Sequence, residues 1–215
     1  KNNFLFLTFD LNDSRVNILR SDILSELEGI LDEIKKNKKI KALIFQSNKE
    51  NNFIAGADIN EIKAISSKND AKEKVKLGQK ILHKFKKMPF PTIAYINGSC
   101  MGGGTELSLF CDYRIASMSD KTKIALPEVN LGIFPGFGGT QNLPKIVGLI
   151  NSLNMILTGK VISAKKALRI GLVDKIIHDA NSGNELILFA QKLQKQTSRI
   201  IIKSKRNKNK FIEKI

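Results

Sequence analysis

Short apolar runs of strand length alternate with longer amphipathic segments along most of this chain, and this alternation limits its possible folds. The apolar runs include 4–11, 40–47 and 92–96. Between them, apolar residues recur at helical spacing over 23–34 and over about 70–87. Strands that alternate with helices predict an α/β fold in which much of the strand pairing is parallel.

The second half of the chain continues the alternation with shorter segments. Strands are predicted at 113–117, at 123–128, where a proline interrupts the run, and at 172–177. A compact helix is predicted over 163–171, because a serine can cap its start and a glycine can end it. The polar stretch 178–185 is predicted to lead into a last helix.

One domain is predicted over 1–195, followed by a basic tail at 196–215. The chain has 215 residues and 42% hydrophobic content, which is enough for one sizeable core. Residues 199–215 contain seven Lys or Arg and one Glu, with apolar residues spaced for an amphipathic helix. We expect this tail to begin a linker helix that docks on its own domain or on a neighbouring chain. Because Lys1 takes the place of an initiator Met, we also expect the chain to be part of a longer protein.

The formal net charge of +16 allows two kinds of partner. Nucleic acid is one, and acidic small molecules are the other. Solvated lysine-rich helix faces explain much of the charge, and no zinc-finger spacing, basic zipper or RNA-binding aromatic motif is present. An RNA-binding role therefore remains only as an alternative. No apolar run reaches the length of about 20 residues that a membrane span needs, and the first residues lack a signal-peptide pattern.

Several common catalytic sets are excluded by their spacing. His83 and His178 accompany neither a nucleophile elbow nor a metal-ligand pattern, so both are predicted to be surface residues, and no metal site is expected. Cys100 and Cys111 form no CxxC pair, which suits small buried residues in a reducing compartment. The stretch GFGGTQ at 136–141 matches neither a phosphate loop nor a dinucleotide fingerprint.

The run GGGTEL at 102–107 is the strongest local indication of chemistry. Consecutive glycines are tolerated where backbone geometry matters more than propensity, and here they open a short predicted helix. Free N–H groups at such a start can stabilise a developing oxyanion, with Glu106 beside them as a base. Glu128 follows Leu-Pro and, taken alone, is equally well explained as a solvated turn residue. A third glycine-containing stretch, 53–58, follows a predicted strand, where α/β proteins commonly bind ligands.

Four ordered stretches resemble the successive signatures of the enoyl-CoA hydratase/isomerase (crotonase) family. They are FIAGADINEI, INGSCMGGGTELSLFCDYRIAS, IALPEVNLGIFPGFGGTQNLPKIVG and ILTGKVISAKKALRIGLVDKII. The resemblance extends from about residue 4 to 178. It implies the family fold, a spiral of ββα repeats, here with a truncated helical C-terminal region.

The resemblance also assigns roles to residues. In the family two backbone N–H groups bind the thioester oxygen, and these correspond to Ala57 and Gly103. The two catalytic glutamates correspond to Glu106 and Glu128, which implies hydration of 2-enoyl-CoA in fatty-acid β-oxidation and also Δ3-Δ2-enoyl-CoA isomerisation. Thioester hydrolysis and decarboxylation remain alternatives, since the family hosts both. The further residues implied in substrate binding are Ala55, Gly56, Asp58, Ile59, Gly102, Phe134, Pro135 and Gly136.

Within the family, the PGFGG stretch with Phe137 is most similar to the multifunctional members of fatty-acid oxidation. In these a 3-hydroxyacyl-CoA dehydrogenase part follows. The resemblance therefore implies no cofactor in this domain, coenzyme A as part of the substrate, and NAD only for the dehydrogenase part. It also implies a bacterial cytoplasmic location rather than a mitochondrial one, and an oligomer or a complex with a thiolase subunit for the longer protein. Asn142 departs from the pattern, because many family members carry Arg there.

Overall fold

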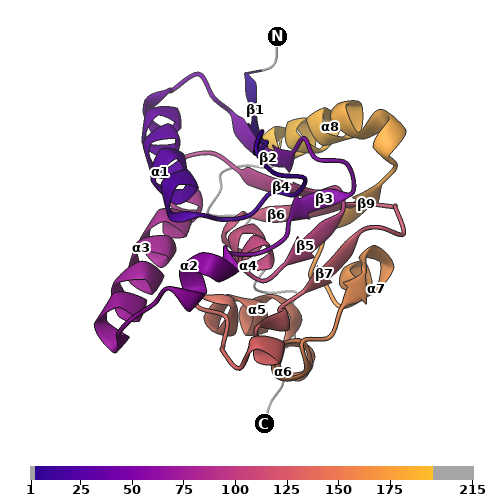
Figure 1. The fold of residues 1–215 in the computed structure, drawn as a ribbon. Helices are drawn as coiled ribbons and strands as arrows, with labels where there is room; N and C mark the ends of the chain where they lie inside the picture. The colour runs from indigo at the N-terminus through magenta and orange to yellow at the C-terminus, as the bar shows by residue number, and fades with distance from the viewer. Residues whose placement is uncertain (1–2, 196–215) are drawn as a thin grey trace.

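The computed structural model describes residues 3–195, and its elements follow the predicted alternation (Figure 1). The predicted tail at 196–215 lies outside the described residues. The first half of the chain forms β1 (Phe4–Phe9), α1 (Ser21–Lys36), β2 (Ala42–Ser47), β3 (Asn52–Ile54), α2 (Ile59–Lys63), α3 (Lys68–Lys86), β4 (Thr92–Ile96), β5 (Ser99–Met101) and α4 (Gly103–Phe110). The second half forms β6 (Tyr113–Ser117), β7 (Lys123–Ala125), the 3₁₀ helix η1 (Pro127–Leu131), α5 (Gly139–Val147), α6 (Leu149–Thr158), β8 (Ile162–Ser163), α7 (Ala164–Arg169), β9 (Lys175–Ile177), the 3₁₀ helix η2 (Asp179–Asn181) and α8 (Ser182–Lys195).

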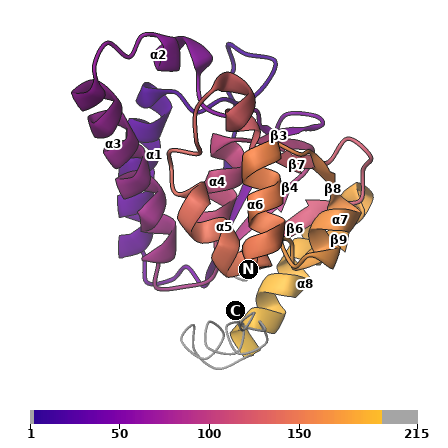
Figure 2. The ribbon, with the colours of Figure 1, turned by 90° about the horizontal axis from the view of Figure 1, so that it is seen from below.

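A five-stranded sheet of order β1-β2-β4-β6-β9 forms the centre of the fold, and every pairing in it is parallel. Alternate residues of its strands face opposite sides. Leu43 and Phe45 of β2 join the larger apolar core, with buried residues of α1, α3 and α4. Ala42 and Ile44 join the smaller core, with Leu186 and other residues of α8. The sheet is therefore buried on both faces, with α1 and α3 on one side and α8 on the other (Figures 1 and 2).

A second sheet of order β3-β5-β7-β8 gives the fold its spiral character. The successive strand pairs β2/β3, β4/β5 and β6/β7 each place the first strand in the five-stranded sheet and the second in the four-stranded one. A helical segment follows each pair. This is the ββα repeat that the family resemblance implied, and β8 closes the smaller sheet by antiparallel pairing with β7. The predicted α/β fold with parallel pairing is confirmed.

The structure corrects some predicted boundaries. The first strand ends at Phe9 rather than at residue 11, and the strand predicted at 172–177 is only Lys175–Ile177. The strand predicted at 123–128 ends at Ala125, because Pro127 lacks an N–H and begins η1 instead. The compact helix after Ser163 is confirmed, and the serine hydroxyl accepts a hydrogen bond from the Lys166 N–H at 3.3 Å.

The shortest strands and three helices, α2, α5 and α6, were not predicted from the sequence. β3, β5 and β8 contain only two or three residues each, which is too short for an alternating pattern to be visible. Helix α5 begins at glycines and contains Pro144, both of which disfavour a helix by propensity alone. Packing against the rest of the protein therefore stabilises this helix. None of the helices within 3–195 is long and apolar enough to cross a membrane.

Candidate active site

The two backbone groups predicted to bind an oxygen lie side by side. Leu19 forms a parallel bridge to Ala57: the Leu19 N–H donates to the Gly56 carbonyl and the Asp58 N–H donates to the Leu19 carbonyl, both within 3.0 Å. Because both backbone bonds of Leu19 go to the neighbours of Ala57, Gly56 and Asp58, the N–H of Ala57 itself points away from Leu19. Gly103 is the first residue of α4, so its N–H has no acceptor within the helix. A Cβ added at Gly103 would lie 3.4 Å from the Ala57 nitrogen.

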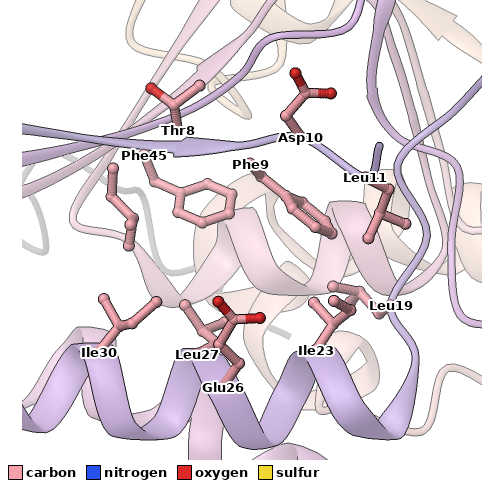
Figure 3. Close-up of a pocket in the computed structure, with 11 residues that line it drawn as sticks. Thr8, Phe9, Asp10, Leu11, Leu19, Ile23, Glu26, Leu27, Ile30 and Phe45 are labelled. Atoms are coloured by element: carbon pink, nitrogen blue, oxygen red, sulfur yellow. The ribbon is translucent and has the colours of Figure 1, made fainter. Parts of the chain in front are cut away.

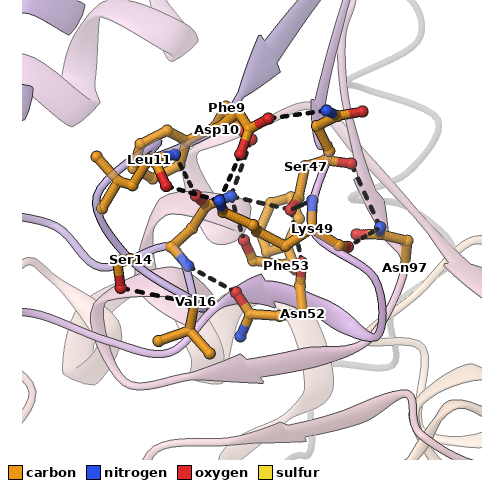
Figure 4. Close-up of polar contacts among 12 residues, drawn as sticks. Phe9, Asp10, Leu11, Ser14, Val16, Ser47, Lys49, Asn52, Phe53 and Asn97 are labelled. Carbon is orange, nitrogen blue, oxygen red and sulfur yellow. Dashed lines mark hydrogen bonds and ion pairs between the residues drawn. The ribbon is translucent and has the colours of Figure 1, made fainter.

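A buried polar hub centred on Asn17 holds the segment that carries Leu19. Its partners Phe9, Leu11, Ser47 and Asn52 are labelled in Figure 4. The side chain of Asn17 is fully buried. Its Oδ1 accepts from the Leu11 N–H at 3.0 Å, and its Nδ2 donates to the Phe9 carbonyl and the Ser47 hydroxyl, both at 2.9 Å. The backbone of Asn17 is also tied to β3, because its N–H donates to Asn52 Oδ1 at 2.8 Å. The hub therefore joins the loop before α1 to the ends of β1, β2 and β3.

Glu106 lies in the first turn of α4, and its side chain is held inside the protein. It is 2% exposed, and its Oε1 accepts from the Gly139 N–H at 2.7 Å. Burial raises the pKa of Glu106 to about 8, the hydrogen bond from Gly139 opposes this rise, and the nearby charge of Glu128 adds to it. A Cβ added at Gly139 would lie 3.1 Å from Glu106 Oε1, so the carboxyl group packs directly against a glycine backbone.

Glu128, from η1, approaches the glycine turn at 102–104, which opens the helix that carries Glu106. It is buried, at 8% exposed, so the interpretation of this residue as a solvated turn residue is wrong. A Cβ added at Gly102 would lie 3.0 Å from Glu128 Oε1, and Gly102 has a φ of +47°, which also favours glycine. Glu128 Oε2 is buried and has no hydrogen-bond partner in the described part of the protein. Burial raises the pKa of this carboxyl group as well.

Ala57, Gly103, Glu106 and Glu128 are thus brought together around the glycine run. The charge of Glu128 affects the pKa of Glu106, which is consistent with two carboxyl groups that share one site. The arrangement places the backbone of Ala57 and Gly103 beside two buried carboxyl groups whose pKa values are both raised. Such a set can stabilise an enolate and exchange protons with it.

The other predicted binding residues have mixed positions. Gly56 lies in the bridge to Leu19, and the Ala55 N–H donates to the Asn17 carbonyl at 2.7 Å, so both are tied to the loop before α1. Asp58 caps α2, with its Oδ1 accepting from the Asn60 N–H at 2.7 Å, and Ile59 begins that helix in an exposed position. Phe134 is 69% exposed.

The remaining two predicted binding residues, Pro135 and Gly136, lie in the loop before α5. Pro135 is buried beside Gly139, where an added Cβ would be 2.9 Å from the Pro135 Cβ. The carbonyl of Gly136 accepts from Gln79 Nε2 of α3 at 2.7 Å. This bond ties the loop to α3.

Asn142, the departure from the family pattern, supports the turn that holds Glu106. It is buried, and its Nδ2 donates to the Gly138 carbonyl at 2.9 Å. Its Oδ1 accepts a hydrogen bond from Lys86 Nζ, which also lies 4.8 Å from the centre of the Phe110 ring. A lysine from α3 therefore brings a positive charge beside Asn142, the position at which the family resemblance implied arginine.

Three residues that support the site were not predicted from the sequence, namely Asn17, Gly139 and Lys86. The glycine pair at 138–139 could have indicated a second close approach of backbone to a side chain. Nothing in the sequence around Asn17 or Lys86 distinguishes them from other asparagines and lysines. The other assignments hold: His83 and His178 are mainly exposed, and both cysteines are buried. Within 3–195 no group of three or more His, Cys, Asp or Glu is placed to hold a metal ion.

A separate apolar pocket lies between β1 and α1 (Figure 3). Phe9 and Phe45 line it from the sheet, and Ile23, Leu27 and Ile30 line it from the helix. None of the predicted site residues lines it. Leu19 connects the two regions, because it lines this pocket and its Cδ1 would lie 3.2 Å from a Cβ added at Gly103.

The chain belongs to the enoyl-CoA hydratase/isomerase family, whose model matches residues 3–214. Solved structures agree with this. The enoyl-CoA hydratase from Bacillus anthracis is 33% identical with a TM-score of 0.82, covering 89% of this chain and 73% of that one. DspI from Pseudomonas aeruginosa is 32% identical with a TM-score of 0.83, covering 95% of this chain and 81% of that one.

Among curated proteins, the chain is similar to alpha subunits of the fatty acid oxidation complex. The subunit of Vibrio parahaemolyticus is 42% identical over 177 residues, which are 82% of this chain, and that of Aliivibrio fischeri is 46% identical over 170 residues, which are 79%. This chain spans about a quarter of the length of each, at 25%. The resemblance to the multifunctional members of fatty-acid oxidation is thereby confirmed.

Proposed function

We propose that this chain hydrates 2-enoyl-CoA thioesters by adding water across the bond between the α- and β-carbons. The observation that carries the proposal is the convergence of two buried carboxyl groups on a turn with two N–H groups suited to one oxygen. The names of the relatives support the same activity, because they include enoyl-CoA hydratases and fatty acid oxidation subunits. The whole protein would act in fatty-acid oxidation.

In the proposed reaction the N–H groups of Ala57 and Gly103 bind the thioester carbonyl oxygen. Polarising this carbonyl withdraws electrons from the β-carbon, which water can then attack. One carboxylate of the pair takes a proton from the water as the new C–O bond forms, and the electron pair of the C=C bond moves into an enolate. The other carboxyl group, protonated, gives its proton to the α-carbon as the enolate collapses. The pair thus ends with the same number of protons.

The raised pKa values support this division of work. With two buried carboxyl groups in one site, the second ionisation is opposed both by burial and by the charge of the first. Because its pKa is raised to about 8, Glu106 can hold a proton near neutral pH, and two interacting carboxyl groups titrate as one unit. One acid and one base are available at once.

The same groups would support isomerisation of a 3-enoyl to a 2-enoyl thioester. A carboxylate removes a proton from the α-carbon, the oxygen site stabilises the dienolate, and a proton returns at the γ-carbon as the double bond moves. No further residue is needed. We include this activity in the proposal because two carboxyl groups reach one site, where a proton can be removed and returned.

The direct test supplies crotonyl-CoA to the full-length protein and follows the loss of enoyl-thioester absorbance, with the product identified by mass. We expect 3-hydroxybutyryl-CoA without free coenzyme A. Release of the free thiol would indicate thioester hydrolysis instead, and loss of carbon dioxide from a malonyl-type thioester would indicate decarboxylation. For the RNA-binding alternative, a mobility-shift assay at physiological salt should show no complex, since nonspecific phosphate contacts weaken steeply with salt.

A further inference from the structure

The ring of Phe137 fills the space between α3 and Gly103, and a hydrogen bond from its backbone lowers the pKa of Glu106. Its ring packs against the larger apolar core. On one side, a Cβ added at Gly78 of α3 would lie 2.4 Å from Phe137 Cε1. On the other side, a Cβ added at Gly103 would lie 3.6 Å from Phe137 Cδ2. The ring therefore spans from one helix to the first residue of the other.

Because Gly78 has no side chain, it leaves a notch in the surface of α3, and the Phe137 ring occupies this notch. A glycine in the interior of a helix costs about 0.5–1 kcal/mol relative to alanine, so its presence in α3 needs a reason. Any side chain there would overlap the ring and force it to move. The loop that carries the ring is also tied to α3, through the bond from Gln79 to the Gly136 carbonyl at 2.7 Å. The ring is thus held in one position from both its backbone and its edge.

The space in front of Gly103 consequently has two apolar walls. A Cβ added at Gly103 would be 3.2 Å from Leu19 Cδ1 and 3.6 Å from the Phe137 ring, with the Ala57 nitrogen at 3.4 Å. If a thioester oxygen binds between the two N–H groups, its carbonyl carbon and α-carbon must enter between Leu19 and Phe137. A flat, unbranched acyl group fits such a slot, and a substituent on the α-carbon would have to displace a packed side chain.

We propose that Phe137, seated in the notch at Gly78, is a specificity-determining residue that selects straight-chain acyl thioesters and rejects those branched at the α-carbon. This inference rests on the proposed function, because it takes the slot to be the thioester site. A single extra methyl group in a well-packed pocket changes affinity by about 10- to 200-fold. Removal of the ring should therefore recover most of that factor for a branched ligand.

The test measures binding rather than turnover, in the full-length protein, with butyryl-CoA and its α-branched isomer isobutyryl-CoA. Calorimetry of the unaltered protein should show at least about tenfold tighter binding of butyryl-CoA. In Phe137→Ala the two dissociation constants should come within about threefold of each other. A folded Phe137→Ala protein that keeps the original ratio would overturn the inference.

Two further variants distinguish the proposed specificity role of Phe137 from a general loss of structure. Phe189→Ala removes another half-buried ring, packed on Tyr113 far from the glycine turn, and should leave the ratio unchanged. Gly78→Ala should push the ring toward Gly103 and weaken both ligands, the branched one more, and adding Phe137→Ala to it should restore binding. If the double variant does not bind better than Gly78→Ala, the claim that Gly78 makes room for the Phe137 ring is wrong.

The inference and the proposed function can fail separately. If the binding ratio responds to Phe137→Ala but no enoyl thioester is hydrated, the hydratase proposal alone is refuted. If crotonyl-CoA is hydrated but Phe137→Ala leaves the ratio of the two dissociation constants unchanged, the specificity role alone is refuted. A protein that binds neither thioester would refute both.

Discussion

The two candidate catalytic glutamates are supported in very different ways. Glu106 stands on α4, a helix in which every residue is buried, and a backbone N–H fixes its carboxyl group. Glu128 stands on the 3₁₀ helix η1, where the other residues are more exposed, and one of its oxygens has no partner in the described part of the protein. The comparison teaches that one carboxyl group is fixed by the protein, while the other keeps an oxygen available for a ligand or water.

The largest expected effect comes from removing either carboxyl group. Glu106→Gln and Glu128→Gln should each lower the turnover of hydration by about 10²–10⁴-fold, because an amide keeps the shape but cannot exchange the proton. Kinetics with crotonyl-CoA, together with circular dichroism as a folding control, would check this. Near-normal turnover in either variant would contradict the two-carboxylate mechanism.

A somewhat smaller effect is expected at the oxygen site. In Gly103→Val the new side chain would crowd the Ala57 nitrogen and Leu19, so the thioester oxygen could not reach its donors. We expect kcat/KM to fall by about 10²–10³-fold, as for loss of an oxyanion donor. The matched variant Gly29→Val lies on α1, where an added Cβ meets nothing within 4 Å, and should keep normal kinetics. Equal kinetics in both variants would place the thioester elsewhere.

The raised pKa of Glu106 predicts how stability depends on pH. Glu106 titrates near pH 8 in the folded protein and near 4.5 when unfolded, so the unfolded chain loses this proton first as pH rises. The free energy of unfolding should therefore fall between about pH 5 and about pH 8, by about 1.4 kcal/mol per pH unit. Glu106→Gln should flatten this fall by an amount on the order of a few kcal/mol. Urea unfolding at the two pH values would measure it, and an unchanged slope would argue against the burial of an ionisable group here.

The smallest effect is expected where Glu106 is supported indirectly. Asn142→Leu removes the side-chain bond to Gly138 and the bond from Lys86, and it loosens the turn in which the Gly139 N–H binds Glu106. We expect roughly a tenfold loss of turnover and a shift in the pH profile, consistent with the loss of about one hydrogen bond. Asn151→Leu is a matched control, because Asn151 makes the same kind of bond to the carbonyl of Val147 at 3.0 Å, on α6. Equal effects in the two variants would reduce Asn142 to a structural role.

The contrast between the two glutamates also shows what the sequence could reveal. The class of fold followed from alternating apolar patterns, and Glu106 from the glycines beside it. The burial of Glu128 could not be predicted from its neighbours, because it depends on the glycine turn, which precedes it by some 25 residues. The family resemblance was needed to pair the two residues.

The supports of the site were hidden for a similar reason. The bonds from Asn17 to Ser47 and from Lys86 to Asn142 join residues 30 and 56 positions apart. Local propensity carries no information about such pairs. The notch at Gly78 is of the same kind, since it is explained only by the ring of Phe137 on a distant loop.

The central claim is that one thioester oxygen binds between the N–H groups of Ala57 and Gly103, with both glutamates facing the adjacent carbons. A crystal structure of the full-length protein with acetoacetyl-CoA, whose enolate resembles the proposed intermediate, would test this most directly. We expect the thioester oxygen within about 3 Å of both nitrogens, and the α-carbon within reach of both carboxyl groups. A ligand whose thioester lies away from the glycine turn, or with the two glutamates on opposite sides of the protein from it, would contradict the account.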